Sequence, residues 1–116
     1  MQRKFRLTRS RDFKRVRQSG KSYAHPLIVL IALANDEMKI RVGVAAGRTM
    51  GTAVKRNRAK RLLREAMRPL IPSLASGWDL ILISRPALAC STLTDTRQAL
   101  INLLQRAQLI SDSDAI

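Results

Sequence analysis

The sequence predicts a mixed α/β fold because stretches with the pattern of strands alternate along it with stretches of helical pattern. Residues 27–34 form a continuous apolar run, and residues 38–46 alternate apolar with polar side chains, as strands do. Two later segments repeat apolar side chains at helical spacing. The chain has 116 residues, of which 46% are hydrophobic, and we expect one domain with a single core over residues 1–116.

The N-terminal part begins with a short predicted helix that ends near Gln18. Thr8 or Ser10 can cap its start, because either hydroxyl accepts a hydrogen bond from a free helical N–H, and Gly20 is placed to end it. The run 27–34 is typical of a strand buried on both faces, and residues 38–46 of a half-buried strand. Turn residues lie between them at 35–37, so we expect the two strands to pair as an antiparallel hairpin.

A longer helix is predicted from Thr52, a favourable N-cap, to Arg68, where Pro69 stops it. Residues at equivalent helical offsets share a face, which makes one side of this helix apolar and the other cationic. The apolar side holds Ala59, Leu62, Leu63, Ala66 and Leu70, and the cationic side holds Asn57, Lys60, Arg61, Arg64 and Arg68. A third short strand at residues 80–83 and a last helix from about residue 94 follow. The first few residues and residues 111–116 are expected to fray.

The charge of the chain is unevenly distributed. There are 22 Lys and Arg residues against 8 Asp and Glu, a formal net charge of +14. Residues 1–68 hold 19 of the cations and 4 of the acids, so the rest of the chain has a net charge of −1. The cations of the first part gather in two blocks, nine at positions 3–21 and seven at positions 55–68. A field of this strength favours a polyanionic partner, most commonly nucleic acid.

Several other classes of protein are disfavoured. The longest apolar run has eight residues, too few to span a membrane, and no apolar stretch follows the basic N-terminus as in a signal peptide, so we expect a cytoplasmic protein. The single cysteine, Cys90, allows no multi-cysteine metal site, and the single histidine, His25, has no catalytic partner. Neither a Walker A loop nor a dinucleotide fingerprint is present. We therefore expect no catalytic residue, no metal site and no small-molecule substrate.

The cationic side of the helix at residues 52–68 is the best candidate for function. A charged helix face is usually just solvated, but such a face normally mixes signs, and here Glu65 stands alone among seven cations. Like charges four residues apart, as in Lys60 and Arg64, destabilise the helix unless a polyanion neutralises them. Five of the seven cations are Arg, which binds phosphate bidentately. This pattern favours nucleic-acid contact.

Phe13, in the first basic block, has two interpretations. It can pack into the core as one apolar residue of a short helix. Beside Arg11, Lys14, Arg15 and Arg17 it can instead stack on an unpaired nucleotide, a contact that tolerates any base.

A specific motif joins the second strand to the basic helix. Residues 47–65 read GRTMGTAVKRNRAKRLLRE, with Arg-Asn-Arg at positions 56–58 and Lys-Arg-Leu at positions 60–62. The pair Asp12-Phe13 with Val16 and Gly20 comes before it, as do residues 41–44, and residues 79–86 follow it. On these residues, and over nearly its whole length, the chain resembles the bacterial ribonuclease P protein subunit.

The resemblance implies a fold and a function. The fold is an α/β, two-layer α+β sandwich of order αβββαβα, whose βαβ unit has a left-handed crossover where general topology favours a right-handed one. The function is to assist ribonuclease P, a ribonucleoprotein endonuclease, in removing the 5′ leader from precursor tRNA. The partner RNA would hold the active site and most of the Mg²⁺.

The resemblance also divides the two basic blocks between two RNAs. The residues that bind the catalytic RNA would be Lys55, Arg56, Asn57, Arg58, Lys60, Arg61, Arg64 and Arg68. Those that bind the leader of precursor tRNA would be Arg11, Phe13, Lys14, Arg17 and Arg48.

Two alternatives share the charge and size. One is a protein that binds ribosomal RNA, and the other is a nucleoid-type protein that prefers duplex DNA. The nucleic acid that copurifies with the chain would distinguish the three.

Overall fold

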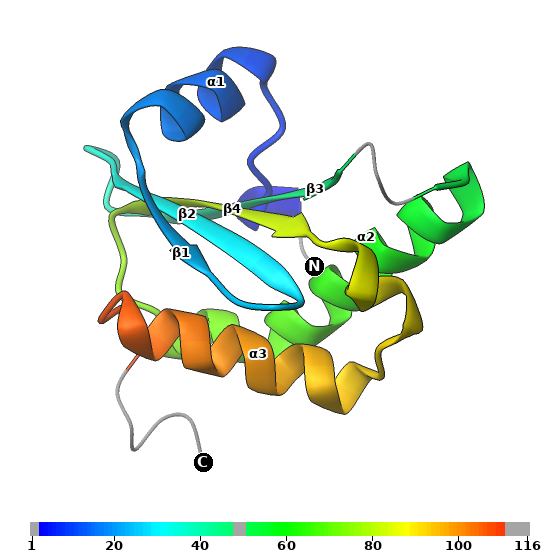
Figure 1. Ribbon diagram of the computed structural model, residues 1–116. Coiled ribbons are helices and arrows are strands. Elements are labelled where there is room, and N and C mark those ends of the chain that lie inside the picture. Colours follow the sequence, from blue (N-terminus) through cyan, green and yellow to red (C-terminus); the bar gives the residue numbers. More distant parts are fainter. Residues whose placement is uncertain (1–2, 48–50, 111–116) are drawn as a thin grey trace.

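The computed structural model describes residues 3–47 and 51–110 (Figure 1). The predicted order αβββαβα is confirmed, with short 3₁₀ segments between the main elements. In chain order the elements are η1 (Arg3–Phe5), α1 (Ser10–Ser19), β1 (Lys21–Ala24), β2 (Ile28–Ala34), β3 (Ile40–Ala46), α2 (Ala53–Met67), η3 (Arg68–Ser73), β4 (Trp78–Ser84), η4 (Pro86–Cys90) and α3 (Leu93–Arg106). The fraying expected at residues 111–116 lies outside the described residues.

The four strands form one sheet in the order β1-β2-β4-β3. β1 pairs with β2 and β2 with β4, both antiparallel, whereas β3 and β4 run parallel. A parallel pair needs a crossover connection, and α2 supplies it, so β3, α2 and β4 make the predicted βαβ unit.

The hairpin predicted between residues 27–34 and 38–46, which correspond to β2 and β3, is wrong. β4 lies between β2 and β3, and the start of β4 hydrogen-bonds to the turn that joins them. Asn35 N donates to the carbonyl of Gly77, the residue before β4, and Gly77 N and Trp78 N donate to Lys39 O. Burial explains the arrangement: β4 is apolar on both faces and takes the centre, while β3 carries Arg41 and takes the edge. β1 has no strong apolar pattern, and analysis of its residues alone missed it.

Helices cover both faces of the sheet (Figure 1). α2 and α3 pack on one face, where alternate residues such as Leu80 and Leu82 enter the main core. α1 lies on the other face over a smaller cluster of Leu7, Val16, Ile31 and Ile81. Because successive strand residues point to opposite faces, Asp79 on β4 and Arg41 and Gly43 on β3 share the face that α1 covers.

The ends of α1 only partly match expectation. Neither Thr8 nor Ser10 caps the helix: the N-cap is Arg9, without a side-chain capping bond. Gly20 does end it, and a side chain there would collide with Val16 O and with Ile31, so glycine allows the close approach of α1 to β2. With ten residues and no cap, α1 depends on its contacts with the sheet for stability.

α2 agrees closely with its prediction. The Thr52 hydroxyl accepts a hydrogen bond from Lys55 N at 3.3 Å, and the helix gives way to 3₁₀ structure just before Pro69. Ala59, Leu63, Ala66 and Leu70 are buried, and Leu62 is half-buried. No helix in the described residues is long and apolar enough to cross a membrane.

Candidate nucleic-acid interface

The outward side of α2 is a band of exposed cations. Within the described residues its one ion pair joins Glu65 to Arg68, at 3.3 Å between side-chain atoms. Six of the eight residues assigned to the catalytic RNA are exposed and two are half-buried, namely Lys60 and Arg64. The exposed six are Lys55, Arg56, Asn57, Arg58, Arg61 and Arg68.

Arg58 lies on the flank of α2 that faces the start of α3. Its guanidinium donates to Ser91 O at 3.3 Å, just before the Thr92 N-cap of α3. Arg58, Arg61 and Leu93 line a small cavity of about 160 Å³ there. Arg58 therefore ties two helices together in addition to presenting charge.

Arg64 lies on the opposite flank of α2, toward α1, and the structure brings it together with Phe13. A cavity of about 200 Å³ runs between the N-terminal segment, β3 and α2. We call it the inner cavity; its lining is Arg6, Leu7, Thr8, Phe13, Val42, Gly43, Val44 and Arg64. Burial, and then the positive charge of Arg6, lowers the pKa of Arg64 from its ordinary value, so two cations approach one cavity without an acid between them.

Phe13 forms a wall of this cavity and is half-buried. A Cβ on Gly43 would collide with the Phe13 ring, so the ring packs directly on bare β3 backbone. The core-packing interpretation of Phe13 is therefore confirmed, since the ring packs against the smaller core cluster. The ring also borders open space, and stacking on an unpaired nucleotide stays a prediction.

A second hollow, of about 610 Å³, lies on the other side of Phe13, and we call it the outer hollow. Its lining is Thr8, Ser10, Phe13, Lys14, Arg17 and Gln18. Three of the predicted leader-binding residues thus meet here. Arg11 is exposed on α1 but lines neither space, and Arg48 lies outside the described residues.

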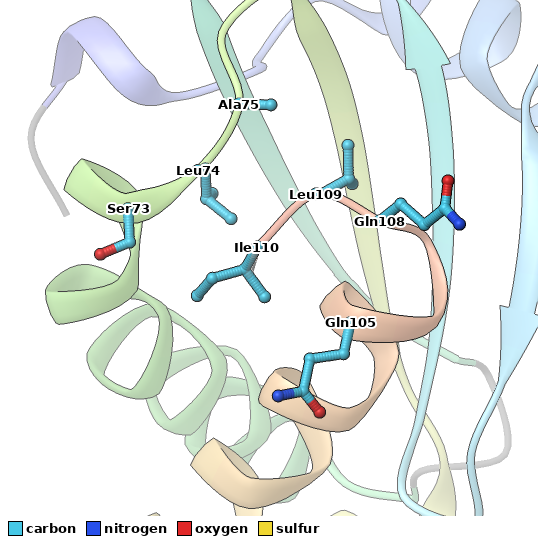
Figure 2. Close-up of a pocket in the computed structure, with 7 residues that line it drawn as sticks. All are labelled: Ser73, Leu74, Ala75, Gln105, Gln108, Leu109 and Ile110. Atoms are coloured by element: carbon cyan, nitrogen blue, oxygen red, sulfur yellow. The ribbon is translucent and has the colours of Figure 1, made fainter. Parts of the chain in front are cut away.

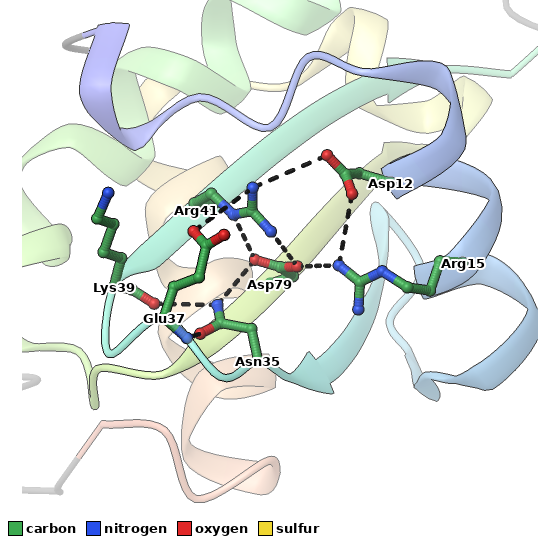
Figure 3. A network of polar contacts seen from close by, with 7 residues as sticks. All are labelled: Asp12, Arg15, Asn35, Glu37, Lys39, Arg41 and Asp79. Atoms are coloured by element: carbon green, nitrogen blue, oxygen red, sulfur yellow. Dashed lines mark hydrogen bonds and ion pairs between the residues drawn. The ribbon is translucent and has the colours of Figure 1, made fainter.

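A buried carboxylate that was missed in the sequence lies beneath α1 (Figure 3). Asp79 is fully buried and accepts hydrogen bonds on Oδ1 from Asn35 (2.9 Å) and Arg41 Nε (2.9 Å), and on Oδ2 from Arg41 (2.8 Å) and Arg15. We call Asp79, Arg41, Arg15 and Asn35 the Asp79 network. Burial alone would raise the pKa of Asp79, but these bonds outweigh burial and hold the pKa below its ordinary value.

The opposite end of the molecule has a different chemistry. A hollow of about 580 Å³ lies between the end of η3 and the end of α3, as Figure 2 shows. Its lining has no charged side chain and comprises Ser73, Leu74, Ala75, Gln105, Gln108, Leu109 and Ile110. Without cations, this hollow is a poor site for a polyanion.

No metal site is evident in residues 3–47 and 51–110, where no three His, Cys, Asp or Glu side chains are grouped to hold an ion. His25 accepts a hydrogen bond at Nδ1 from Leu27 N at 3.1 Å, as a polar residue at a strand edge does. Cys90 is exposed.

Comparison with known proteins gives one consistent family. A family model described as Ribonuclease P matches residues 1–108. The "Ribonuclease P protein component" of Herpetosiphon aurantiacus is 41% identical over 114 residues, covering 98% of this chain and 93% of the relative. That of Dehalococcoides mccartyi strain 195 is 38% identical over 109 residues, covering 94% and 89%.

Solved structures agree with this result. An RNase P protein of Staphylococcus aureus superposes with a TM-score of 0.81 at 26% identity, covering 92% of this chain and 98% of that one. The RNase P protein of Thermotoga maritima gives 0.77 at 31% identity, covering 87% and 96%. These superpositions support the αβββαβα fold that the resemblance implied. The ribosomal and nucleoid alternatives are not favoured by these matches.

Proposed function

Because the chain belongs to the bacterial ribonuclease P protein family, we propose that its two basic surfaces bind two RNAs, the catalytic RNA and the 5′ leader of precursor tRNA. The protein is a subunit of the ribonucleoprotein that processes tRNA. Cleavage belongs to the RNA, and the protein contributes binding, in the cytoplasm where transcripts are made.

The outward side of α2 binds the catalytic RNA. This proposal is supported by the nearly unpaired row of cations at exposed positions, whose mutual repulsion a phosphate backbone would relieve. The residues assigned to this contact are Lys55, Arg56, Asn57, Arg58, Lys60, Arg61 and Arg68.

The leader strand passes Phe13. The inner cavity and the outer hollow meet at this ring, and each is lined by two cations, Arg6 and Arg64 in the first and Lys14 and Arg17 in the second. Cations on both sides of an aromatic edge suit a single strand that stacks a base while its phosphates lie beside the arginines. We therefore assign Arg64 to binding of the leader instead of the catalytic RNA. Arg11 and Arg48 keep their assignment to the leader, although Arg11 lines neither space and Arg48 lies outside the described residues.

The RNA partner, and not this chain, holds the Mg²⁺ of the enzyme. The acids of the described residues fit a magnesium site poorly, since Asp79 is saturated by arginine and asparagine donors and Asp12 lies within 3.8 Å of Arg15 and Arg41. The protein lowers the Mg²⁺ requirement indirectly, by bringing positive charge to two RNAs that repel each other.

The position of Phe13 between two cationic spaces is the observation that carries the proposal, and a pair of variants tests it. Phe13→Leu keeps an apolar side chain but removes the stacking face, and Arg61→Ala removes an exposed cation of α2. We expect Phe13→Leu to weaken holoenzyme binding of precursor tRNA but not of tRNA without a leader. Arg61→Ala should weaken binding of the catalytic RNA.

Lys39→Ala is the matched control for lost charge, because Lys39 is an exposed cation in the turn before β3 and lines neither the inner cavity nor the outer hollow. Equal behaviour of Phe13→Leu and the native chain toward the two substrates would contradict the leader assignment. Equal catalytic-RNA affinity of Arg61→Ala and Lys39→Ala would contradict the α2 assignment.

A further inference from the structure

The Asp79 network joins the middle of α1 to two strands that are far from it in sequence (Figure 3). Arg41 binds Asp79 with two nitrogens across the parallel pair β3–β4, and Arg15 reaches down from α1 to the same carboxylate. Asp12, also on α1, lies 3.7 Å from Arg15 and 3.8 Å from Arg41. Three of the eight acids of a strongly basic chain, Asp12, Glu37 and Asp79, are thus gathered at one place.

The network and the leader surface lie on opposite flanks of α1. At 100° per residue, Val16 points at the sheet, Asp12 and Arg15 lie on one side of it, and Phe13 and Arg17 lie on the other. The burial agrees with this, because Val16 is inaccessible and Phe13 packs on Gly43. Any rotation or shift of α1 that lengthens the Arg15–Asp79 contact therefore moves Phe13 relative to Arg64 and β3.

A directional contact is needed to fix the orientation of α1, because the apolar cluster on which the helix packs is small. Leu7, Val16, Ile31 and Ile81 make a cluster that permits sliding, and α1 has no capping bond to fix its start. A buried ion pair gives little net stability over apolar packing of similar volume, but its bonds are satisfied in only one geometry. The placement of Asp79 is thus better suited to fixing an orientation than to adding stability.

We propose that Asp79, acting through Arg15, is a positioning residue for the leader strand. It sets the distance of α1 from β3 and α2, and so holds the Phe13 ring between the inner cavity and the outer hollow. This inference rests on the proposed function, because it assigns Asp79 and Arg15 a role in the leader surface without placing either in contact with RNA.

The test uses Arg15 because its removal leaves the rest of the network intact. The Arg15 side chain is 40% exposed, so Arg15→Gln leaves the Asp79–Arg41 pair and the Asn35 bond in place. Arg15→Lys keeps the charge but loses the planar guanidinium. Lys39→Gln removes one exposed cation from the same neighbourhood and is the charge-matched control.

The measured quantity is the ratio of holoenzyme affinities for precursor tRNA and for the same tRNA without its leader. Loss of a cation outside the leader surface weakens binding of both substrates equally and leaves the ratio of their affinities unchanged. We expect Arg15→Gln to lower the ratio about threefold to tenfold, because the stacking contact at Phe13 is misplaced but not removed. Arg15→Lys should recover part of the loss, and affinity for the catalytic RNA should equal that of Lys39→Gln.

Three outcomes are informative in different ways. If Phe13→Leu lowers the ratio and Arg15→Gln does not, the positioning role is wrong while the leader assignment survives. If Phe13→Leu leaves the ratio unchanged, the proposed leader surface itself is wrong. If Arg15→Gln weakens both substrates and the catalytic RNA equally, the residue has only a structural role and the inference fails.

Discussion

Asp79 shows how one residue can organise a surface that it does not touch. Its carboxylate is fully buried yet stays ionised, because Arg41, Asn35 and Arg15 supply four donors to its two oxygens. The same interaction raises the pKa of Arg41, and the main cause of this rise is the hydrogen bond from Arg41 to Asp79. A single acid thus holds two arginines in fixed orientations.

The network makes the stability of the protein depend on pH in acid. Since the pKa of Asp79 in the folded state is below its ordinary value, the network stabilises the fold above that ordinary value and loses this contribution as the pH falls through the folded pKa. We expect the free energy of unfolding of the native chain to exceed that of Asp79→Asn at neutral pH, and the difference to shrink below about pH 4. Urea unfolding across this range measures it. A difference that is independent of pH would contradict the account.

Single residues were predictable where the signal is local. Thr52 caps α2 and Gly20 ends α1 as expected, because each acts within its own segment. Asp79 was missed because its partners come from three other segments, and only the strand order brings them together. The one signal in the sequence for a buried ion pair was the position of Asp79, an acid at the start of an apolar strand in a basic chain.

At the scale of elements, α2 combines a packed stripe, an exposed cationic side and two flanks with separate contacts. The stripe and the cationic side follow from 3.6-residue periodicity and were predicted. The flanks were not, since a helical pattern does not say which neighbour lies on each side. The structure places Arg58 against the start of α3 and Arg64 beside Phe13.

Arg58 and Arg61 should therefore respond differently to truncation. Both variants should weaken binding of the catalytic RNA and reduce the slope of log affinity against log salt by about one. Arg58→Ala should also lower the free energy of unfolding by about 1 kcal/mol, because it loses the bond to Ser91 O. Salt-dependent binding and urea unfolding of the two proteins measure these effects. Equal stability of the two variants would contradict a linking role for Arg58.

The sheet shows the limit of pairing strands by their order along the chain. Adjacent apolar segments joined by a short turn favour a hairpin, yet β4 enters between β2 and β3 because its two apolar faces gain most from the central position. The family resemblance, not the pattern of residues, correctly implied the βαβ unit.

At the scale of the whole molecule, the fold gathers many of the cations behind the net charge of +14 on the two surfaces that we propose bind RNA. α2 presents one surface, and the Phe13 edge of α1 presents the other, with Arg64 at their boundary. The end formed by η3 and α3 has an uncharged hollow (Figure 2). The two basic blocks of the sequence match these surfaces only in part, because Arg64 of the second block lines the inner cavity with Arg6 of the first.

This charge should reduce the need of the enzyme for Mg²⁺. We expect the catalytic RNA to cleave precursor tRNA at a lower Mg²⁺ midpoint with the native protein than without it, since protein cations replace part of the counterion atmosphere. Lys39→Ala should behave as the native chain, and Arg61→Ala should give a smaller shift. Cleavage titrated in Mg²⁺ measures the midpoints, and identical midpoints with and without the native protein would contradict the role given to the charge.

Site-directed crosslinking tests most directly the central claim that the two surfaces bind different RNAs. With the exposed Cys90 replaced by Ser, a single cysteine at position 17 or 61 carries a short photoreactive group in the assembled holoenzyme with precursor tRNA bound. The account predicts that position 17 crosslinks to the 5′ leader and position 61 to the catalytic RNA. Crosslinks from position 17 to the catalytic RNA alone, or from position 61 to the leader, would contradict it.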